Sequence, residues 1–146
     1  MTPAAQLSLF TKRKAAALPP ASEFAVHCVL ADLLRKSIAP GWVWFHPPNG
    51  GERPAFVNKK GKRVSIEGGR LQRMGTRPGV SDFILVAPNG GRIHALELKA
   101  KGEKPTEAQM QFLQAVENAG GTAGWADSFN GAVEILKAWG AVRVRL

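Results

Sequence analysis

Two acidic residues and a lysine lie on one predicted β-hairpin. The apolar runs at 82–86 and 93–98 are typical of strands, and the Pro-Asn-Gly-Gly segment at 88–91 is typical of a tight turn between them. A turn centred between Asn89 and Gly90 places Asp82 opposite Glu97, on the same side of the sheet. This prediction holds for a turn of two or four residues, whereas a three-residue loop would break it.

Opposed carboxylates repel each other, so the pair indicates that something lies between them. A divalent cation is the usual solution, and oxygen ligands favour Mg²⁺ or Mn²⁺. Lys99 follows Glu97 by two residues and therefore shares its face of the strand, where an ammonium can orient an attacking water and stabilise phosphoryl charge. We infer phosphodiester hydrolysis. The alternatives are that Asp82 caps the strand and that Glu97 and Lys99 form a solvated edge pair.

The charge of the chain favours a polyanionic partner. It has 146 residues, with Lys plus Arg at 20 and Asp plus Glu at 11, for a net charge of +9. The residues predicted to hold a nucleic-acid backbone are Lys59, Lys60, Lys62, Arg63, Arg70, Arg73 and Arg77, the alternative being a solvated loop. His46 and Asn49, beside a Pro-Pro-Asn-Gly-Gly segment, are candidate DNA contacts or turn residues, whereas His27 and His94 are interpreted as structural.

Composition excludes other classes of protein. Cys28 is the only cysteine, which rules out a disulfide scaffold, and its apolar surroundings predict burial. No apolar run approaches the about 20 residues that span a bilayer. The basic triplet at 12–14 follows rather than precedes a short apolar stretch, unlike a signal peptide. We therefore expect a soluble protein of the cytoplasm, with no membrane partner.

The elements that must position these residues indicate one α/β domain. Residues 1–21 have the composition of a disordered tail, and 22–146 form the expected domain. Helices are predicted over 22–36, 65–74, 107–119 and 130–139, strands over 42–46, 82–86, 93–98, 122–126 and 141–144, and a loop or weak hairpin over 52–64. This order predicts a mixed central sheet flanked by helices.

At this point the motifs resemble a known family. Gly79-Val80-Ser81-Asp82 followed by Glu97-Leu98-Lys99 looks like the signature of the PD-(D/E)XK nucleases. More narrowly, the chain resembles the VRR-NUC branch, through Glu23, the Pro-Asn-Gly-Gly loop at 48–51, the Gly-Thr-Arg-Pro-Gly-Val-Ser-Asp segment at 75–82, Glu-Leu-Lys at 97–99 and Gln109. The VRR triplet itself is not matched. The resemblance runs from about Ser22 to Trp139.

The resemblance implies a role for each matched residue. Asp82, Glu97 and the backbone carbonyl of Leu98 would bind the metal, and Lys99 would position the attacking water. Glu23 would be a further metal ligand or water-positioning acid, although an acid in a first helical turn also suits the helix dipole. Gln109 would support Lys99 or contact a phosphate, although Thr106 and Gln109 also match a capping box.

The expected function is a Mg²⁺- or Mn²⁺-dependent DNA endonuclease. No segment for reading base sequence is evident, so we expect selectivity for branched or junction DNA. A chain this short would need a second copy to cut two strands symmetrically, which predicts a homodimer. The alternatives are a non-catalytic nucleic-acid-binding module with the same fold and a sequence-specific restriction-type endonuclease.

The N-terminal tail contains one further motif. Gln6, Leu7, Leu9 and Phe10 belong to a pentapeptide that resembles the segment with which bacterial replication proteins bind the sliding clamp. A flexible segment with two apolar anchors and a glutamine can dock into a preformed groove. The alternative is a short apolar tail packed on the body of the protein or on a second subunit.

Overall fold

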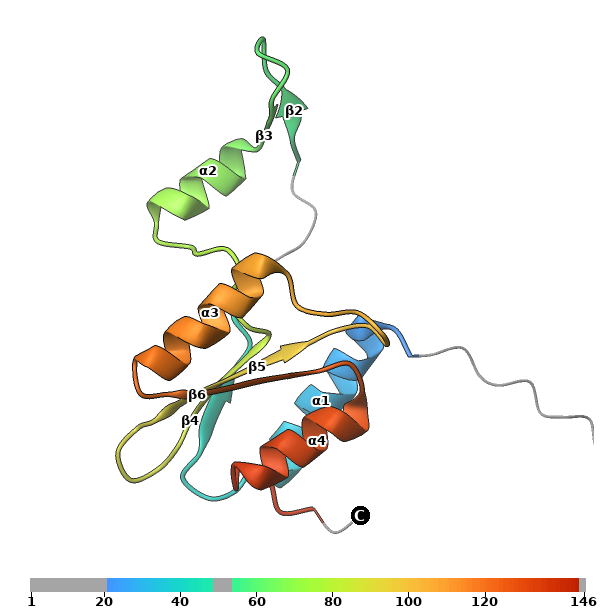
Figure 1. The fold of residues 1–146 in the computed structure, drawn as a ribbon, viewed down its shortest axis with the longest axis vertical. Coiled ribbons are helices and arrows are strands. Elements are labelled where there is room, and N and C mark those ends of the chain that lie inside the picture. The colour runs from blue at the N-terminus through green and yellow to red at the C-terminus, as the bar shows by residue number, and fades with distance from the viewer. Residues whose placement is uncertain (1–20, 49–53, 145–146) are drawn as a thin grey trace, which may run out of the picture.

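The computed structural model describes residues 21–48 and 54–144 (Figure 1). Its main sheet has four strands in the order β1-β4-β5-β6. These strands are β1 (Val43–Phe45), β4 (Phe83–Val86), β5 (Ile93–Leu98) and β6 (Thr122–Ala126). β1 and β5 run antiparallel to β4, whereas β6 runs parallel to β5. The predicted fold class, an α/β domain with a mixed central sheet, is confirmed.

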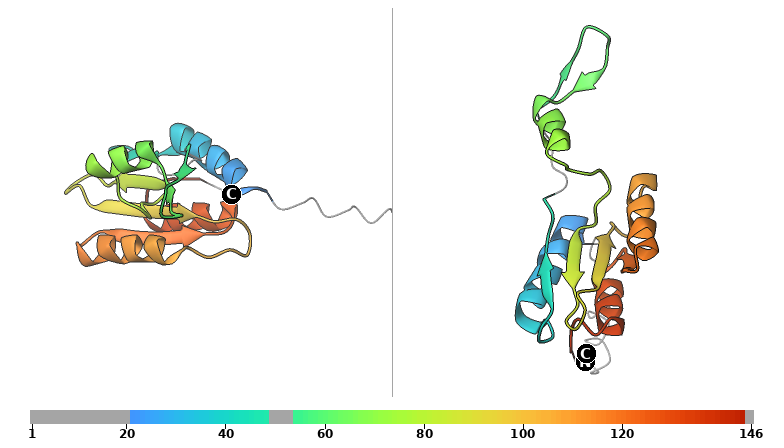
Figure 2. Two further views of the ribbon diagram at one scale, coloured as in Figure 1. Left: turned by 90° about the horizontal axis from the view of Figure 1, so that it is seen from above. Right: turned by 90° about the vertical axis from the view of Figure 1, so that its left-hand side faces the viewer.

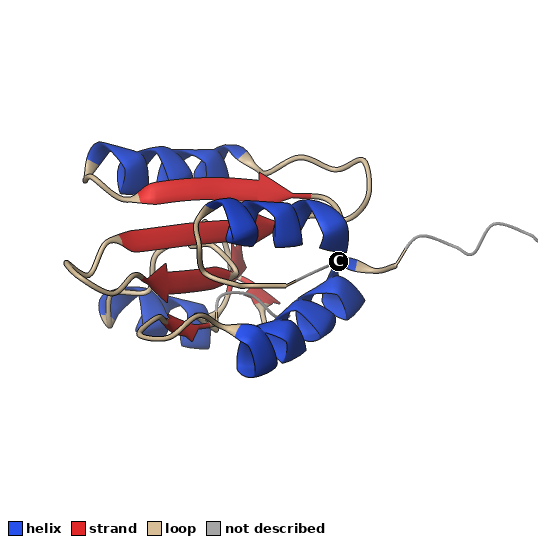
Figure 3. Cartoon of the chain, turned by 90° about the horizontal axis from the view of Figure 1, so that it is seen from below, coloured by secondary structure: helices blue, strands red, loops and turns tan. Residues whose placement is uncertain are grey.

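Helices cover both faces of the sheet (Figures 2 and 3). α1 (Glu23–Ser37) and α4 (Phe129–Ala138) share one core cluster with Phe83, Leu85 and Leu96. α3 (Glu107–Asn118) packs on the opposite face, where Leu113 meets Ile84 and Ala95. Successive strand residues point to opposite faces, so the continuous apolar run of β4 contributes to both clusters.

A projecting arm extends from one end of this body (Figures 1 and 2). It consists of a two-stranded ribbon, β2 (Phe56–Val57) and β3 (Arg63–Val64), followed by α2 (Ile66–Arg73). Ser65 is the N-cap of this helix, since its hydroxyl accepts a hydrogen bond of 3.0 Å from the backbone N–H of Gly68. None of its residues is buried. We call residues 54–75 the arm below.

Two local predictions are wrong. Residues 141–144 form no strand, and Val142 makes only an isolated bridge with Ile38. Cys28 is exposed rather than buried, because the buried side of α1 is Val26, Leu30, Ala31 and Leu34. A long apolar run does not reveal which of its residues the helix turns away from the sheet.

No helix among the described residues combines the length and hydropathy needed to cross a membrane. The clamp-like pentapeptide at 6–10 lies outside the described residues.

Candidate functional site

The β4–β5 hairpin has the predicted register. Its turn is residues 88–91, closed by a hydrogen bond of 2.9 Å from the Ala87 N–H to the Arg92 carbonyl. Asn89 has a φ of 60° and Gly90 a φ of 127°, which is why an Asn-Gly pair suits this turn. Phe83 pairs with Leu96, so the next positions along the ladder are Asp82 and Glu97. The four-residue turn satisfies the condition on which that pairing depended.

Asp82 stands at the beginning of β4 with its two carboxylate oxygens directed to different partners. Oδ2 accepts a hydrogen bond of 2.8 Å from the backbone N–H of Leu98, which anchors the side chain across the hairpin. Oδ1 lies 3.9 Å from Nδ1 of His27 on α1. The carboxylate is thus held in place while one oxygen remains available to a further ligand.

Glu97 is the most unusual acid of the site. It is 2 % exposed, and its Oε1 accepts a hydrogen bond of 2.5 Å from the Gln109 side-chain amide. Its Oε2 is buried and has no hydrogen-bond partner among the described residues. Burial, followed by the nearby Asp82 charge, raises the pKa of Glu97 to about 7, against the opposing effect of Lys99. A buried carboxylate oxygen without a donor is an environment that a cation would satisfy.

Lys99 lies between two acids from different elements. Its Nζ is 3.4 Å from Glu97 Oε1 and 3.8 Å from Glu23 Oε2 at the start of α1, and its side chain is 11 % exposed. The prediction that Lys99 shares the neighbourhood of Glu97 is therefore supported by the geometry. Glu23 is far from Lys99 in the sequence, and the packing of α1 brings the two side chains together.

The capping box predicted for Gln109 is confirmed, and its side-chain amide contacts Glu97, a partner that the sequence analysis did not assign to it. Thr106 accepts from the Gln109 N–H at 3.3 Å, and Gln109 Oε1 accepts from the Thr106 N–H at 2.8 Å, which together form a capping box. The amide nitrogen of the same side chain donates to Glu97. The cap at the start of α3 therefore orients the group that holds Glu97.

Gly79 sets how closely α3 approaches the loop that leads into β4. Its φ is +77°, and a Cβ there would lie 2.4 Å from the Ala108 carbonyl oxygen. Only glycine allows this contact. The glycine of the sequence motif thus places the N-terminus of α3 beside the site.

One interpretation of the histidines is wrong. His94 is structural, with its ring 4.9 Å from the Trp42 ring and 5.0 Å from the Trp139 ring. His27 is not isolated, because it lies beside His46 and Asp82. One atom of each of the three side chains that could bind a metal lies within 4.8 Å of the other two. Burial, followed by the neighbouring His46, lowers the pKa of His27. No sequence spacing signals this cluster, since its members come from three separate segments.

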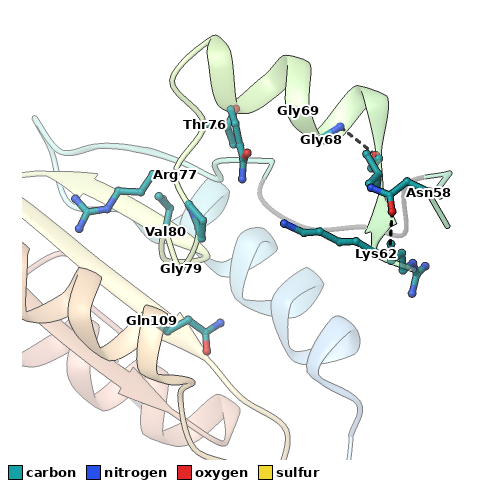
Figure 4. A pocket seen from close by; sticks show the side chains of 14 residues that line it. Asn58, Lys62, Gly68, Gly69, Thr76, Arg77, Gly79, Val80 and Gln109 are labelled. Atoms are coloured by element: carbon teal, nitrogen blue, oxygen red, sulfur yellow. Dashed lines mark hydrogen bonds between the residues drawn. The ribbon is translucent and has the colours of Figure 1, made fainter. Parts of the chain in front are cut away.

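The predicted nucleic-acid-binding residues fall into two groups. Lys62, Arg63 and Arg77 line a cavity of about 750 Å³ between the arm and the body. Figure 4 shows α2 and β3 on one side of it and the Gly79 loop with Gln109 on the other. Arg70 and Arg73 line a different hollow on α2, and Lys59 and Lys60 lie exposed on the ribbon turn.

Among the remaining predicted contacts, His46 is exposed and its Nδ1 lies 2.6 Å from the carbonyl oxygen of Asp82. Asn49 lies outside the described residues.

The donor set fits a hard divalent cation. Asp82, just before β4, and Glu97, on β5, offer carboxylate oxygens, of which Glu97 Oε2 is buried and has no donor in the described part of the chain. Glu23 contacts the same lysine as Glu97. Oxygen ligands of this kind suit Mg²⁺ and Mn²⁺.

The comparisons with known proteins identify the family and agree with the fold. The family model of the VRR-NUC domain matches residues 35–130. A solved structure described as a VRR_NUC domain protein superposes with a TM-score of 0.62 at 18 % identity, covering 82 % of this chain and 88 % of that chain. At that identity the likeness concerns the fold alone. No curated protein sequence matches the chain.

Proposed function

The chain belongs to the VRR-NUC domain family and has its nuclease-type fold, and from this premise we propose that it is a metal-dependent DNA endonuclease. The observation that carries the proposal is the convergence of Asp82, Glu97 and Lys99 at one end of the sheet. A pair of carboxylates with an ammonium beside it is not needed to stabilise the fold, least of all when Glu97 Oε2 is buried and has no hydrogen-bond partner within 21–48 and 54–144. It is the set that phosphodiester hydrolysis requires.

Asp82, Glu97, the Leu98 carbonyl and Glu23 are the residues that we propose to hold Mg²⁺ or Mn²⁺. A bound divalent ion would supply Lewis-acid stabilisation of the charge on the scissile phosphate and would acidify a nearby water. Lys99 orients that water and stabilises the charge that develops on the phosphate oxygens. Gln109 is a positioning residue, because it acts through Glu97.

The substrate backbone would lie in the cavity between the arm and α3. Lys62, Arg63 and Arg77 provide positive charge along that cavity, which ends at Gln109. A phosphate bound at that end of the cavity would lie beside the N-terminus of α3, from which Gln109 contacts Glu97. Contacts of this kind reach backbone rather than base edges, so they favour selection by DNA shape over selection by sequence.

The test is a cleavage panel. Wild-type protein, Asp82→Ala and Lys99→Ala are incubated with duplex, nicked, flapped and four-way DNA in Mg²⁺, Mn²⁺ or EDTA. We expect metal-dependent cleavage of branched DNA by the wild type alone. Binding without cleavage in every metal would favour the non-catalytic module, and fixed fragments from linear duplex would favour a restriction-type enzyme.

We propose a homodimer as the active form on branched DNA. Symmetric cleavage of two strands needs two sites related by a two-fold axis, and one chain holds one site. Light scattering coupled to size exclusion tests this, because a monomer that makes paired cuts would contradict it.

We also propose that residues 6–10 bind a sliding clamp. The support is the sequence motif alone. Deletion of residues 1–14 is expected to abolish capture by the clamp while sparing cleavage of DNA. Undiminished capture by the truncated protein would contradict the proposal.

A further inference from the structure

We propose that His27, His46 and Asp82 form a second cation site, selective for a divalent transition-metal ion that favours imidazole, such as Zn²⁺. The site lies beside the proposed Mg²⁺ position and shares Asp82 with it. It concerns ion binding and does not require that the protein cleave DNA.

Three segments bring the ligands together. His27 lies on α1, His46 follows β1 and Asp82 precedes β4, and one ligand atom from each lies within 4.8 Å of the others. Ligand atoms about 2.1 Å from one ion lie at most about 4.2 Å apart, so small side-chain rotations complete the site. The existing separation of 3.9 Å between His27 Nδ1 and Asp82 Oδ1 already meets that limit.

The hydrogen bond of His46 prepares its ring for a cation. Nδ1 of His46 lies 2.6 Å from the backbone carbonyl oxygen of Asp82. A carbonyl can only accept, so Nδ1 carries the proton and a neutral ring keeps its lone pair on Nε2. Metal-binding histidines are commonly oriented in this way, by donation from the other ring nitrogen to a backbone carbonyl.

Packing fixes the orientation of His27. Its ring stacks on the buried Phe83 ring, with centroids 4.4 Å apart, and meets the His46 ring edge-on at the same centroid distance. The two imidazoles thus lie edge to face beside the Asp82 carboxylate. A cation bound by both rings would account for the arrangement.

The ligand chemistry separates the two sites. The proposed Mg²⁺ position has oxygen ligands, whereas imidazole nitrogen favours transition metals and is a poor ligand for Mg²⁺. Asp82 can serve both, because Oδ2 faces the Leu98 N–H and Oδ1 faces His27. The inferred consequence is that ions differing in softness bind at different places.

Nitrogen-detected imidazole NMR on the full chain tests the inference, because the protein has three histidines. Zn²⁺ added to the metal-free protein is expected to shift the ring nitrogens of His27 and His46 in a saturable way. His94, enclosed by two tryptophan rings, is the internal control and should not shift. Mg²⁺, which does not bind the imidazoles directly, should shift the His27 and His46 ring nitrogens much less than Zn²⁺ does. Unshifted signals from His27 and His46, or equal shifts at all three histidines, would overturn the proposal.

Variants separate this site from the proposed nuclease site. His27→Asn and His46→Asn should each weaken Zn²⁺ binding by at least about tenfold in calorimetry, whereas His94→Gln should not. Glu97→Gln should retain Zn²⁺ binding while losing Mg²⁺ binding. If both histidine variants bind Zn²⁺ as the wild type does, the pair is not a metal site and a proton relay becomes the better account. Zn²⁺-dependent shifts in a protein that cuts no DNA would support this inference while refuting the proposed function.

Discussion

The carboxyl end of β5 and the arm differ in almost every physical respect. At the end of β5 the charged groups are enclosed, with Glu97 2 % exposed and the Lys99 side chain 11 % exposed. On the arm even apolar side chains face solvent, with Ile66 at 75 % and Met74 at 73 % exposed. The first region concentrates acids among fixed elements, whereas the second carries lysines and arginines on a projecting ribbon and helix.

The difference shows how one small domain can divide two tasks. Bond cleavage needs charged groups held at set separations, and sheet and helix ends provide this because their side chains are anchored by packing and hydrogen bonds. Holding a phosphate backbone needs positive charge near the right place but little fixed geometry. Changes at the β5 end should therefore alter rate or stability, and changes on the arm should alter affinity.

The largest expected effect is on catalysis. Lys99→Met should reduce the cleavage rate by about 10³-fold, because it removes charge stabilisation in the transition state. DNA affinity measured in EDTA should change little. Lys137→Met on α4, a partly exposed lysine whose Nζ lies 3.3 Å from Glu134 Oε1, is the matched control. Equal rates for Lys99→Met and the wild type would remove Lys99 from the site.

The next largest expected effect is a loss of stability in Gly79→Ala. The new methyl group would meet the Ala108 carbonyl at 2.4 Å in backbone already at positive φ, and we expect destabilisation by about 3 kcal/mol or more in urea unfolding. Gly75→Ala at the end of the arm has a similar φ but open space, so it should cost only about 1–2 kcal/mol. Similar losses of stability in both variants would mean that the close contact of Gly79 with α3 is not what makes its substitution costly.

Removing charge from the arm should weaken DNA binding without affecting the metal site. The variant Lys59→Gln, Lys60→Gln, Lys62→Gln, Arg63→Gln should lose about tenfold to a hundredfold in affinity and show a shallower salt dependence. Its affinity for Mn²⁺ should equal that of the wild type. The variant Arg35→Gln, Lys36→Gln, Lys137→Gln, Arg143→Gln removes the same four charges outside the arm and controls for net charge. Equal losses of affinity in both variants would mean that the position of the positive charge on the arm is unimportant.

The smallest expected effect is the pH-dependent stability of the metal-free protein. The pKa of Glu97 is raised to about 7 in the folded state, so its neutral form stabilises the protein at low pH and that contribution is lost as pH rises from about 4.5 through 7. Glu97→Gln should therefore be more stable than the wild type at pH 8, by about 1–3 kcal/mol, and equal to it at pH 4. Calorimetric melting at both pH values measures this. A pH-independent difference would mean that Glu97 does not titrate near neutrality.

Local signals predicted much of the site. The Asn89-Gly90 turn sets the hairpin register, and the alternation of apolar residues sets which faces are buried, so the pairing of Asp82 with Glu97 follows from a few neighbouring residues. The capping box of Thr106 and Gln109 can likewise be recognised within a segment of four residues. Rules of this kind act within one element or one turn, and for that reason a sequence expresses them directly.

Tertiary packing determined the contacts that spacing along the sequence could not predict. His27 reaches His46 and Asp82, Glu23 reaches Lys99, and Gln109 reaches Glu97 only because α1 and α3 cross the sheet at one end. The exposure of Cys28 and the projection of α2 are decided in the same way, by which surfaces find a partner. The histidine cluster depends on contacts between segments that are distant in the sequence. The raised pKa of Glu97 depends on the removal of water from around its carboxylate. Both conditions arise only when the helices pack on the sheet.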